Sequence, residues 1–428
     1  MHTYLKNGAA LTPIIERVEK KISARHREIE AQSESNQFRV LKAFRDHKVS
    51  DSHFIPSTGY GYDDQGRDTL EAIYADVFGA EAGLVRPQII SGTHAISIAL
   101  FGLLRPGDEL LYITGRPYDT LEEIVGIRGN GHGSLKDFNI GYDHVELDDN
   151  GYVDTDEVLQ RIKPNTKVIG IQRSKGYAMR PSYRIDEIKG LIRTIKLHYP
   201  NIIVFVDNCY GEFVEELEPC HVGADLMAGS LIKNPGGGLA KTGGYIVGTK
   251  ALVELCSYRM TSPGIGAEAG ASLYALQEMY QGFFLAPHVV SQSLKGAVFT
   301  AGMFEELGMK TIPSWSETRT DLIQAVEFGD RDRMVAFCQA IQYTSPINAH
   351  FTPYPDYMPG YEDDVIMAAG TFVQGASIEL SADGPLRSPY AVYIQGGLTY
   401  EHVKIAICSA LDELIEKNHF SIKEIQAK

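Results

Sequence analysis

The feature that most constrains the fold is a series of short apolar runs separated by long connections. The runs are "ELLYI" at 109–113, "KVIGIQ" at 167–172, "IIVFVD" at 202–207 and "YIVG" at 245–248. Their length and their β-branched residues are typical of buried parallel strands. Because the stretches between them are long enough for crossover helices, residues of about 50–285 are predicted to form a doubly wound α/β domain.

Helical periodicity fills the chain before these runs. "TLEAIYADVFG" at 69–79 and "HAISIALFGLL" at 94–104 each place their apolar residues on one helical face. The turn signal "RPGDE" at 105–109 then separates the second of these helices from the first strand. Near the N-terminus, residues 14–30 repeat isoleucine and valine near helical spacing between charges, which predicts a further helix.

The C-terminal third has a different pattern. Residues 286–320 are mostly helical in character, and the alternating runs "TFVQGASIEL" and "YAVYIQGG" follow, then the amphipathic "HVKIAICSALDELIEK". This order predicts a smaller α+β domain. A chain of 428 residues is also too long for one compact core. We therefore expect an N-terminal helical arm at 1–50, a large α/β domain at 51–285, and a linking helix with the small domain at 286–428.

Composition excludes several classes of protein. The net charge of −15 argues against a nucleic-acid groove and against an anionic membrane surface. The longest apolar run, at 95–104, is about half of a membrane span, and the N-terminus has no secretory signal. The five cysteines are scattered without metal-binding spacing, which fits reduced thiols. We expect a cytoplasmic protein without a metal site.

The segment "GSLIKNPGGGLAKTGG" at 229–244 contains two lysines, Lys233 and Lys241, either of which could be a functional residue. One hypothesis makes Lys241 the lysine of a nucleotide-binding phosphate loop. That motif requires glycine where this chain has Pro235 and Ala240, and it must open a helix. Here the segment runs into the strand-like "GGYIVG", so the surroundings argue against this hypothesis.

Lys233 has more favourable surroundings. It follows the strand-like "DLMAGSLI", and Asp207 ends the run "IIVFVD" 26 residues earlier (233 − 207). Ligands of open α/β sheets gather at the carboxyl ends of strands. A lysine and a carboxylate there are the pair that pyridoxal phosphate needs, for a Schiff base and for a protonated ring nitrogen. Taken alone, each residue could equally be a solvated lysine or a capping aspartate.

Two further features fit this cofactor. "SGTHAI" places Ser91, Gly92 and Thr93 at the start of a predicted helix, where free amides favour a phosphate. The same letters also suit a plain helix cap. Ser230 adds a hydroxyl just before Lys233. Tyr118, after the strand at 109–113, would project at the same sheet edge and could stack on the ring.

Together, these motifs make the chain resemble a fold-type I pyridoxal-phosphate enzyme of the cysteine and methionine metabolism group. It is most similar to the methionine γ-lyase-like family, also labelled cystathionine β-lyase involved in aluminium resistance. The resemblance spans residues 59–398 and rests on "GYGYDDQGRDTLEAIYADVFGAE", "SGTHAI", "VDNCYGEF", "GSLIKNPGGGLAKTGGYIVG" and "ADGPLRSPYAVYIQGGLT". It implies the fold-type I transferase architecture, a mainly parallel sheet flanked by helices plus a smaller C-terminal α+β domain.

The resemblance also implies roles for single residues. Lys233 resembles the Schiff-base lysine, Asp207 the partner of the ring nitrogen and Tyr118 the stacking tyrosine. Gly92, Thr93 and Ser230 resemble the phosphate ligands, with Ser91 beside them.

Arg387, in "GPLRSPY", resembles the arginine that binds the substrate carboxylate, although it could also be a surface ion pair. Better-known lyases have a hydroxyl residue where this chain has Ile232. Their Tyr-x-Arg pair, given by the neighbouring subunit, corresponds to Tyr60 or Tyr62 and Arg67 at a wider spacing.

The activity implied is that of a carbon–sulfur lyase acting on a sulfur-containing amino acid, of the cystathionine β-lyase or methionine γ-lyase type. An aminotransferase, another amino-acid enzyme, or a non-catalytic pyridoxal-phosphate-binding stress protein remain alternatives. The expected partners are a small amino-acid substrate and further copies of the chain. The resemblance implies a homodimer or homotetramer with sites shared between subunits.

Overall fold

The computed structural model describes residues 4–420, which divide into two compact units. The larger unit is Ser35–Ala286, and the smaller one combines the chain up to and including Glu34 with the chain from Pro287 onward. In the part of the chain described here, no helix is long and apolar enough to cross a membrane.

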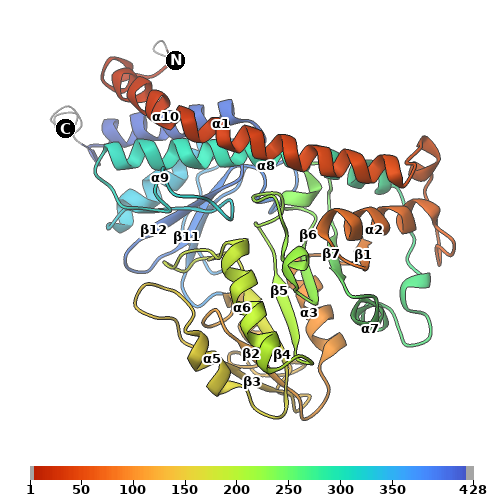
Figure 1. The fold of residues 1–428 in the computed structure, drawn as a ribbon. Helices are drawn as coiled ribbons and strands as arrows, with labels where there is room; N and C mark the ends of the chain where they lie inside the picture. The colour runs from red at the N-terminus through yellow and green to blue at the C-terminus, as the bar shows by residue number, and fades with distance from the viewer. Residues whose placement is uncertain (1–3, 421–428) are drawn as a thin grey trace. The chain divides into compact units, whose positions relative to one another are not determined.

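A seven-stranded sheet forms the centre of the larger unit (Figure 1), in the order β1-β7-β6-β5-β4-β2-β3. All its strands are parallel except β7, which runs antiparallel to both neighbours. The mainly parallel sheet is therefore confirmed. The strands are β1 Ala82–Arg86, β2 Glu109–Tyr112, β3 Gly141–His144, β4 Thr166–Gln172, β5 Ile203–Asp207, β6 Leu226–Ser230 and β7 Gly244–Gly248.

The direction of β7 corrects one expectation. The run "YIVG" is a strand as predicted, but it is not parallel to its neighbours. The connection from β6 holds only the short 3-10 helix η3, Asn234–Gly236. A parallel return usually needs a crossover helix that packs on the sheet. This connection has none, and it turns the chain back beside β6.

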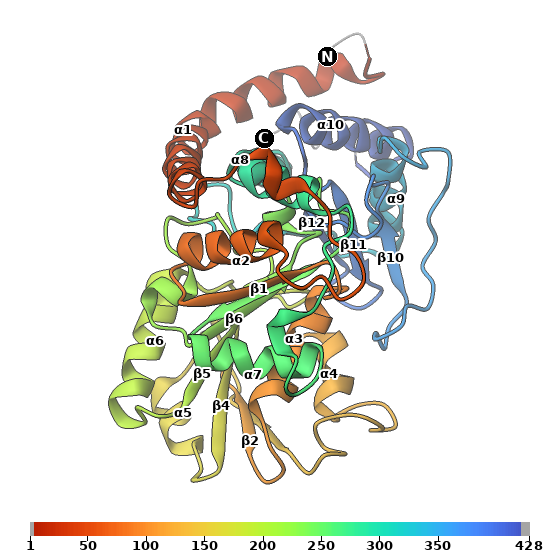
Figure 2. The same cartoon turned by 90° about the vertical axis from the view of Figure 1, so that its right-hand side faces the viewer.

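Helices cover both faces of this sheet (Figure 2). α3 packs against β6 and β7 on one face beside α7, while α5 and α6 lie together on the other. The predicted helices at 69–79 and 94–104 are confirmed as α2 and α3, and with them the doubly wound architecture. The helices are α2 Gln65–Phe78, α3 Gly92–Leu103, α4 Asp119–Val125, α5 Thr155–Arg161, α6 Ile185–His198 and α7 Lys250–Met260.

The parallel strands bring their carboxyl ends to one side of the sheet, which we call the carboxyl edge. Asp207, the last residue of β5, pairs in register with Gln172 of β4 and Ala228 of β6. Ser230 ends β6 two residues beyond Ala228 and pairs with Gly244 of β7. The loops that follow these strands therefore meet at the carboxyl edge, where open α/β sheets bind their ligands.

The smaller unit contains a five-stranded antiparallel sheet in the order β10-β11-β12-β9-β8. α9 packs on this sheet and α10 packs on α9. The α+β character of the C-terminal part is confirmed. Its elements are β8 Thr311–Ile312, β9 Gln324–Glu327, α9 Arg331–Tyr343, β10 Val365–Ala368, β11 Ser381–Pro385, β12 Ala391–Gln395 and α10 Tyr400–Glu416.

Two long helices have residues in both units, α1 (Gly8–Asp46) and α8 (Leu276–Glu306). The helix predicted at 14–30 is confirmed as part of α1. The helical prediction for 286–320 holds only to Glu306, because Gly308 adopts a left-handed φ of 79° just after the helix.

The alternating run at 371–380 does not form a strand, since this segment consists of bends and turns. The amides of Phe372 and Val373 donate to the carboxylate of Glu379, at 2.8 and 2.9 Å, instead of to a neighbouring strand. These hydrogen bonds to a nearby side chain take the place of the main-chain hydrogen bonds between strands that an alternating sequence pattern favours.

Candidate active site at the carboxyl edge

Lys233 lies in the compact loop between β6 and β7, three residues after Ser230. The glycines that follow it allow close packing of main chain on main chain. A Cβ added to Gly236 would come 1.7 Å from the oxygen of Leu231, and one added to Gly237 would come 2.2 Å from the oxygen of Gly282 in α8. The glycine run therefore fixes the loop against the body of the larger unit.

Lys241, the other lysine of this segment, is exposed and forms an ion pair of 2.5 Å with Glu278. The chain after it enters β7 rather than a helix. A phosphate loop needs a helix N-terminus at this point, so the nucleotide-binding hypothesis is excluded.

The amine of Lys233 lies over the ring of Tyr210, with Nζ 4.0 Å from the ring centroid. In the described part of the chain, Nζ has no hydrogen-bond or ion-pair partner. Burial by itself lowers the pKa of Lys233, but Cys209, Tyr210, Asp207 and Glu212 raise it, and the net direction is upward. The amine is thus enclosed by groups that favour positive charge, yet it is not committed to a bond.

Asp207 is buried at the end of β5, where its Oδ1 accepts a hydrogen bond of 3.1 Å from the Cys209 amide. Burial raises the pKa of the Asp207 carboxyl, and the Lys233 charge is the strongest influence that lowers it. The two predicted residues are therefore electrostatic neighbours. A buried carboxyl of this kind stays ionised only when a cation lies beside it, as a protonated ring nitrogen would.

Gly92 and Ser230 form a cradle where the first turn of α3 meets the end of β6. A Cβ added to Gly92 would come 3.1 Å from Cys209 Sγ and 3.2 Å from the Ser230 Cβ. The Ser230 hydroxyl is buried and has no hydrogen-bond partner within residues 4–420. The first amides of a helix also lack partners within the helix, so this cradle offers unpaired donors to an anion.

The other two residues of the predicted phosphate site have protein partners. The Ser91 hydroxyl accepts a hydrogen bond of 3.0 Å from the His94 amide, so Ser91 is the N-cap of α3. The Thr93 hydroxyl lies 3.3 Å from that of Thr120. The capping role that the sequence left open for Ser91 is the one observed for its side chain.

Tyr118 is joined to the carboxyl edge through Gln172, the residue that pairs with Asp207. The Tyr118 amide donates to Gln172 Oε1 at 2.9 Å. Its ring packs on the next loop: a Cβ added to Gly176 would come 2.7 Å from the ring, and the Tyr177 ring lies 5.9 Å away between centroids. Tyr118 is thus connected to the carboxyl edge through Gln172, and its ring packs on the loop that contains Gly176 and Tyr177.

Tyr62 and Arg67 use their side chains elsewhere. The exposed Tyr62 ring stacks on Tyr60, with centroids 5.3 Å apart. The buried Arg67 guanidinium donates to the oxygens of Gly61 and Gly270, at 2.5 and 3.0 Å. Within one chain, the described contacts of these residues do not include Lys233, Ser230 or Gly92.

Arg387 belongs to the smaller unit, where it follows β11. Its Nη1 forms an ion pair of 3.1 Å with Asp363, and both side chains are partly exposed. The surface ion pair that the sequence left open is therefore present. The guanidinium already holds one carboxylate, which is the kind of group it was predicted to bind in a substrate.

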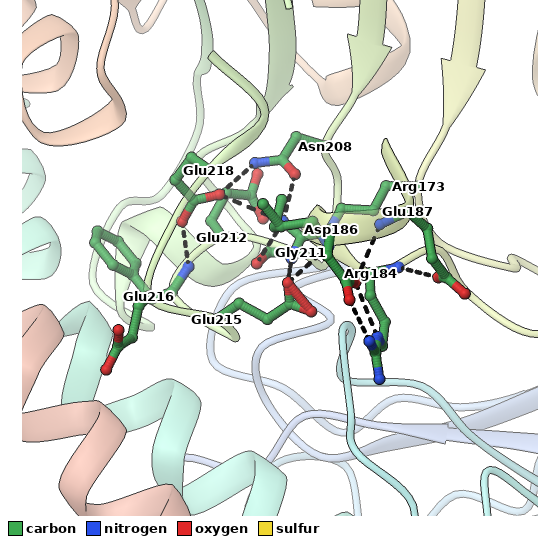
Figure 3. A network of polar contacts seen from close by, with 12 residues as sticks. Arg173, Arg184, Asp186, Glu187, Asn208, Gly211, Glu212, Glu215, Glu216 and Glu218 are labelled. Carbon is green, nitrogen blue, oxygen red and sulfur yellow. Dashed lines mark hydrogen bonds and ion pairs between the residues drawn. The ribbon is translucent and has the colours of Figure 1, made fainter. Parts of the chain in front are cut away.

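The loop after β5 also belongs to the site, although none of its residues was among those predicted from the sequence. A buried arginine, Arg173, holds this loop: its Nη1 donates to Asn208 Oδ1 at 2.8 Å and to the Gly211 oxygen at 3.0 Å, and it approaches Glu218 (Figure 3). These bonds fix a turn in which Tyr210 takes a positive φ of 72°. The position of "NCYGEF" directly after a buried strand was the available signal.

A pyridoxal phosphate group fits these residues. The unpaired hydroxyl of Ser230 and the Gly92 cradle suit its phosphate, Asp207 suits its ring nitrogen, and the uncommitted amine of Lys233 suits its aldehyde. No group of three or more His, Cys, Asp or Glu side chains could hold a metal ion within residues 4–420.

Comparison with known proteins agrees with this geometry. The sequence profile of the family described as methionine gamma-lyase matches residues 11–415. The uncharacterized protein YnbB of Bacillus subtilis (strain 168) is 73% identical over 418 residues, 97% of this chain and 99% of that protein.

Two solved structures are also similar. A Listeria monocytogenes protein, named provisionally as a cystathionine beta-lyase involved in aluminium resistance, is 65% identical with a TM-score of 0.92, covering 94% of this chain and 99% of that one. A Clostridium novyi NT protein, named as a carbon-sulfur lyase involved in aluminium resistance, is 45% identical with a TM-score of 0.91, covering 96% of each chain.

Proposed function

The chain belongs to the methionine gamma-lyase family, and on this basis we propose that it is a pyridoxal-phosphate-dependent carbon–sulfur lyase acting on a sulfur-containing amino acid. The observation that carries the proposal is the meeting of Lys233, Asp207, Gly92 and Ser230 at one edge of the sheet. The name of the Clostridium novyi relative, a carbon-sulfur lyase, supports the reaction class.

Each residue at the carboxyl edge has a separate task in this proposal. Gly92, Thr93 and Ser230 hold the phosphate, Asp207 keeps the ring nitrogen protonated, and Lys233 bonds to the aldehyde. When bound, the cofactor supplies an extended π system that accepts the electrons of the substrate Cα–H bond.

Proton transfer falls to the side chains. Lys233 would be the general base that takes the proton from the substrate Cα. Tyr118 would contact the cofactor ring and donate a proton to the leaving sulfur. Arg387 binds the substrate carboxylate, which fixes the Cα–H bond in the orientation that the reaction needs.

We further propose that the chain works as a homodimer or homotetramer in the cytoplasm. Tyr60 and Tyr62 are 69% and 55% exposed, so they are available to a neighbouring subunit, with Arg67 holding the loop that carries them. All five cysteines are unpaired, which suits a reducing compartment.

The test of the activity is product analysis with cystathionine, cysteine and methionine as substrates. The lyase proposal expects a thiol (hydrogen sulfide in the case of cysteine), a 2-oxo acid and ammonia to be released in equal amounts. Transfer of the amino group to an added oxo acid without thiol release would instead identify an aminotransferase. Binding of the cofactor without any product would identify a non-catalytic protein.

A further inference from the structure

Glu212, in the loop that follows β5, contacts the Lys233 segment in two ways. Its main-chain oxygen accepts a hydrogen bond of 2.9 Å from the side-chain amide of Asn234, the residue after Lys233. Its carboxyl packs on the main chain of Gly229 in β6, where an added Cβ would come 2.5 Å from Glu212 Oε1. The carboxyl therefore lies directly behind the segment that carries the lysine.

This carboxyl is fully buried and has no cationic partner. Glu212 is 0% exposed, and its Oε1 accepts a hydrogen bond of 2.7 Å from the Tyr245 hydroxyl. Its Oε2 has no hydrogen-bond partner, and no ion pair reaches it from any described residue. A carboxylate in this position would carry the full cost of desolvation, so the protonated acid is favoured.

The ionisable groups that face Glu212 come from several elements: Tyr245 of β7, Tyr74 of α2, Cys209 and Glu218 of its own loop, and Lys233. Burial is the largest influence on the pKa of Glu212 and raises it, while the Tyr245 hydroxyl and the Glu212 main-chain amide lower it. The Glu218 charge raises it and the Lys233 charge lowers it, and the net result is a pKa raised to about 8. In return, negative charge on Glu212 is one of the influences that raise the pKa of Lys233.

We propose that Glu212 is a positioning residue that controls the proton on the Lys233 nitrogen: while protonated it lets that nitrogen release its proton, and once ionised it holds the proton there. The inference rests on the proposed function, in which Lys233 must lose a proton to bond to the cofactor and again to act as a base. A buried charge acts strongly on its neighbours because little solvent screens it. Glutamine has nearly the same shape as glutamate but cannot change its charge.

The direct test is a pH titration of the visible absorption band of the pyridoxal-phosphate-loaded protein, which reports the proton on the linked Lys233 nitrogen. In Glu212→Gln the midpoint should lie about one pH unit below that of the wild type, because the ionised carboxylate is missing. Glu212→Asp, which keeps an ionisable group, should restore most of the difference.

Glu109→Gln is the matched control. Glu109 is also a buried carboxyl of the larger unit. It begins β2, so it lies at the amino-terminal ends of the parallel strands, opposite the carboxyl edge. Its removal should leave the midpoint unchanged, whereas a general effect of losing one negative charge would move both variants alike.

A second readout needs no cofactor. Carbamoylation of Lys233 by cyanate, followed by mass spectrometry, measures the fraction of neutral amine. Above the pKa of Glu212, the Glu212→Gln protein should react about tenfold faster than the wild type, and below it the two rates should agree.

The outcomes separate the two proposals. Unchanged midpoints in a folded, cofactor-loaded Glu212→Gln protein, or equal alkaline carbamoylation rates, would overturn the role of Glu212. Failure of the wild type to bind the cofactor would contradict the proposed function instead, and the carbamoylation rates would still decide the role of Glu212.

Discussion

Gly92, the first residue of α3, lies against Ser230, the last residue of β6, so closely that an added Cβ would come 3.2 Å from the Ser230 Cβ. The two residues are 138 positions apart in the chain (230 − 92). They meet because α3 packs across β6. Their contact joins a helix N-terminus to a buried, unpaired hydroxyl, and this is the part of the site assigned to the cofactor phosphate.

The cradle predicts that Gly92→Ala weakens cofactor binding without unfolding the chain. The new methyl group would press on Cys209 Sγ at 3.1 Å and on Ser230, which narrows the space for a phosphate. We expect the dissociation constant of pyridoxal phosphate to rise about tenfold, a change of about 1.4 kcal/mol, by equilibrium dialysis. Gly190→Ala in α6 is the control, since nothing lies within 4 Å of its added Cβ, and it should bind normally.

Ser230→Ala is expected to separate binding from stability. The Ser230 hydroxyl has no hydrogen-bond partner among the described residues, so its loss should leave the melting temperature of the cofactor-free chain unchanged or slightly higher. Loss of a hydrogen bond to a charged phosphate should weaken cofactor binding by about 10- to 100-fold. If the variant retains the cofactor as tightly as the wild type, Ser230 is not a phosphate ligand.

Ser91→Ala, in contrast to Ser230→Ala, is expected to lower the stability of the folded chain. The Ser91 hydroxyl caps α3 through the His94 amide, so its removal should lower the free energy of unfolding by about 1 kcal/mol. Thermal unfolding of both serine variants, measured side by side, checks the two expectations together.

The raised pKa of Glu212 predicts that the stability of the cofactor-free chain depends on pH. Its folded pKa of about 8 lies above the ordinary value of 4.5, so between these two values the folded chain holds a proton that the unfolded chain releases. The contribution of Glu212 therefore falls as pH rises through this window, by at most about 1.4 kcal/mol per pH unit. Urea unfolding at several pH values should show Glu212→Gln gaining stability relative to the wild type as pH rises. Parallel curves would contradict the raised pKa.

The ion pair of Arg387 and Asp363 allows a test of the substrate clamp. Both side chains are partly exposed, so breaking the pair should change the free energy of unfolding by less than about 1 kcal/mol. If Arg387 binds the substrate carboxylate, Arg387→Ala should raise KM by at least about tenfold, since a charged hydrogen bond is lost. Asp363→Asn should not raise KM. Equal effects of the two substitutions would show that only their ion pair matters.

Several elements could be predicted from local sequence alone. β2, β4 and β5 coincide closely with apolar runs whose β-branched residues suit a buried strand. Lys233 and Asp207 could be paired in advance, because parallel strands bring their carboxyl ends to the same edge. The periodicity of residues 69–79 and 94–104 likewise marked α2 and α3.

Features that depend on non-local packing could not be predicted. The direction of β7 follows from the compactness of the glycine loop against Gly282, which no periodicity reveals. The segment 371–380 alternates like a strand, but the carboxylate of Glu379 takes its amides. Tyr210 lies under the Lys233 amine, and Glu212 bonds to Asn234 beside it, in a loop that Arg173 holds through Asn208 and Gly211.

The account depends most directly on the amine of Lys233. The decisive measurement is borohydride reduction of the pyridoxal-phosphate-treated protein followed by peptide mass spectrometry, with Lys233→Ala and Lys241→Ala as a pair. The account predicts a phosphopyridoxyl group on Lys233 in the wild type and in Lys241→Ala, and loss of the visible absorption band in Lys233→Ala. A label on Lys241 or on no lysine, or a band that survives in Lys233→Ala, would contradict it.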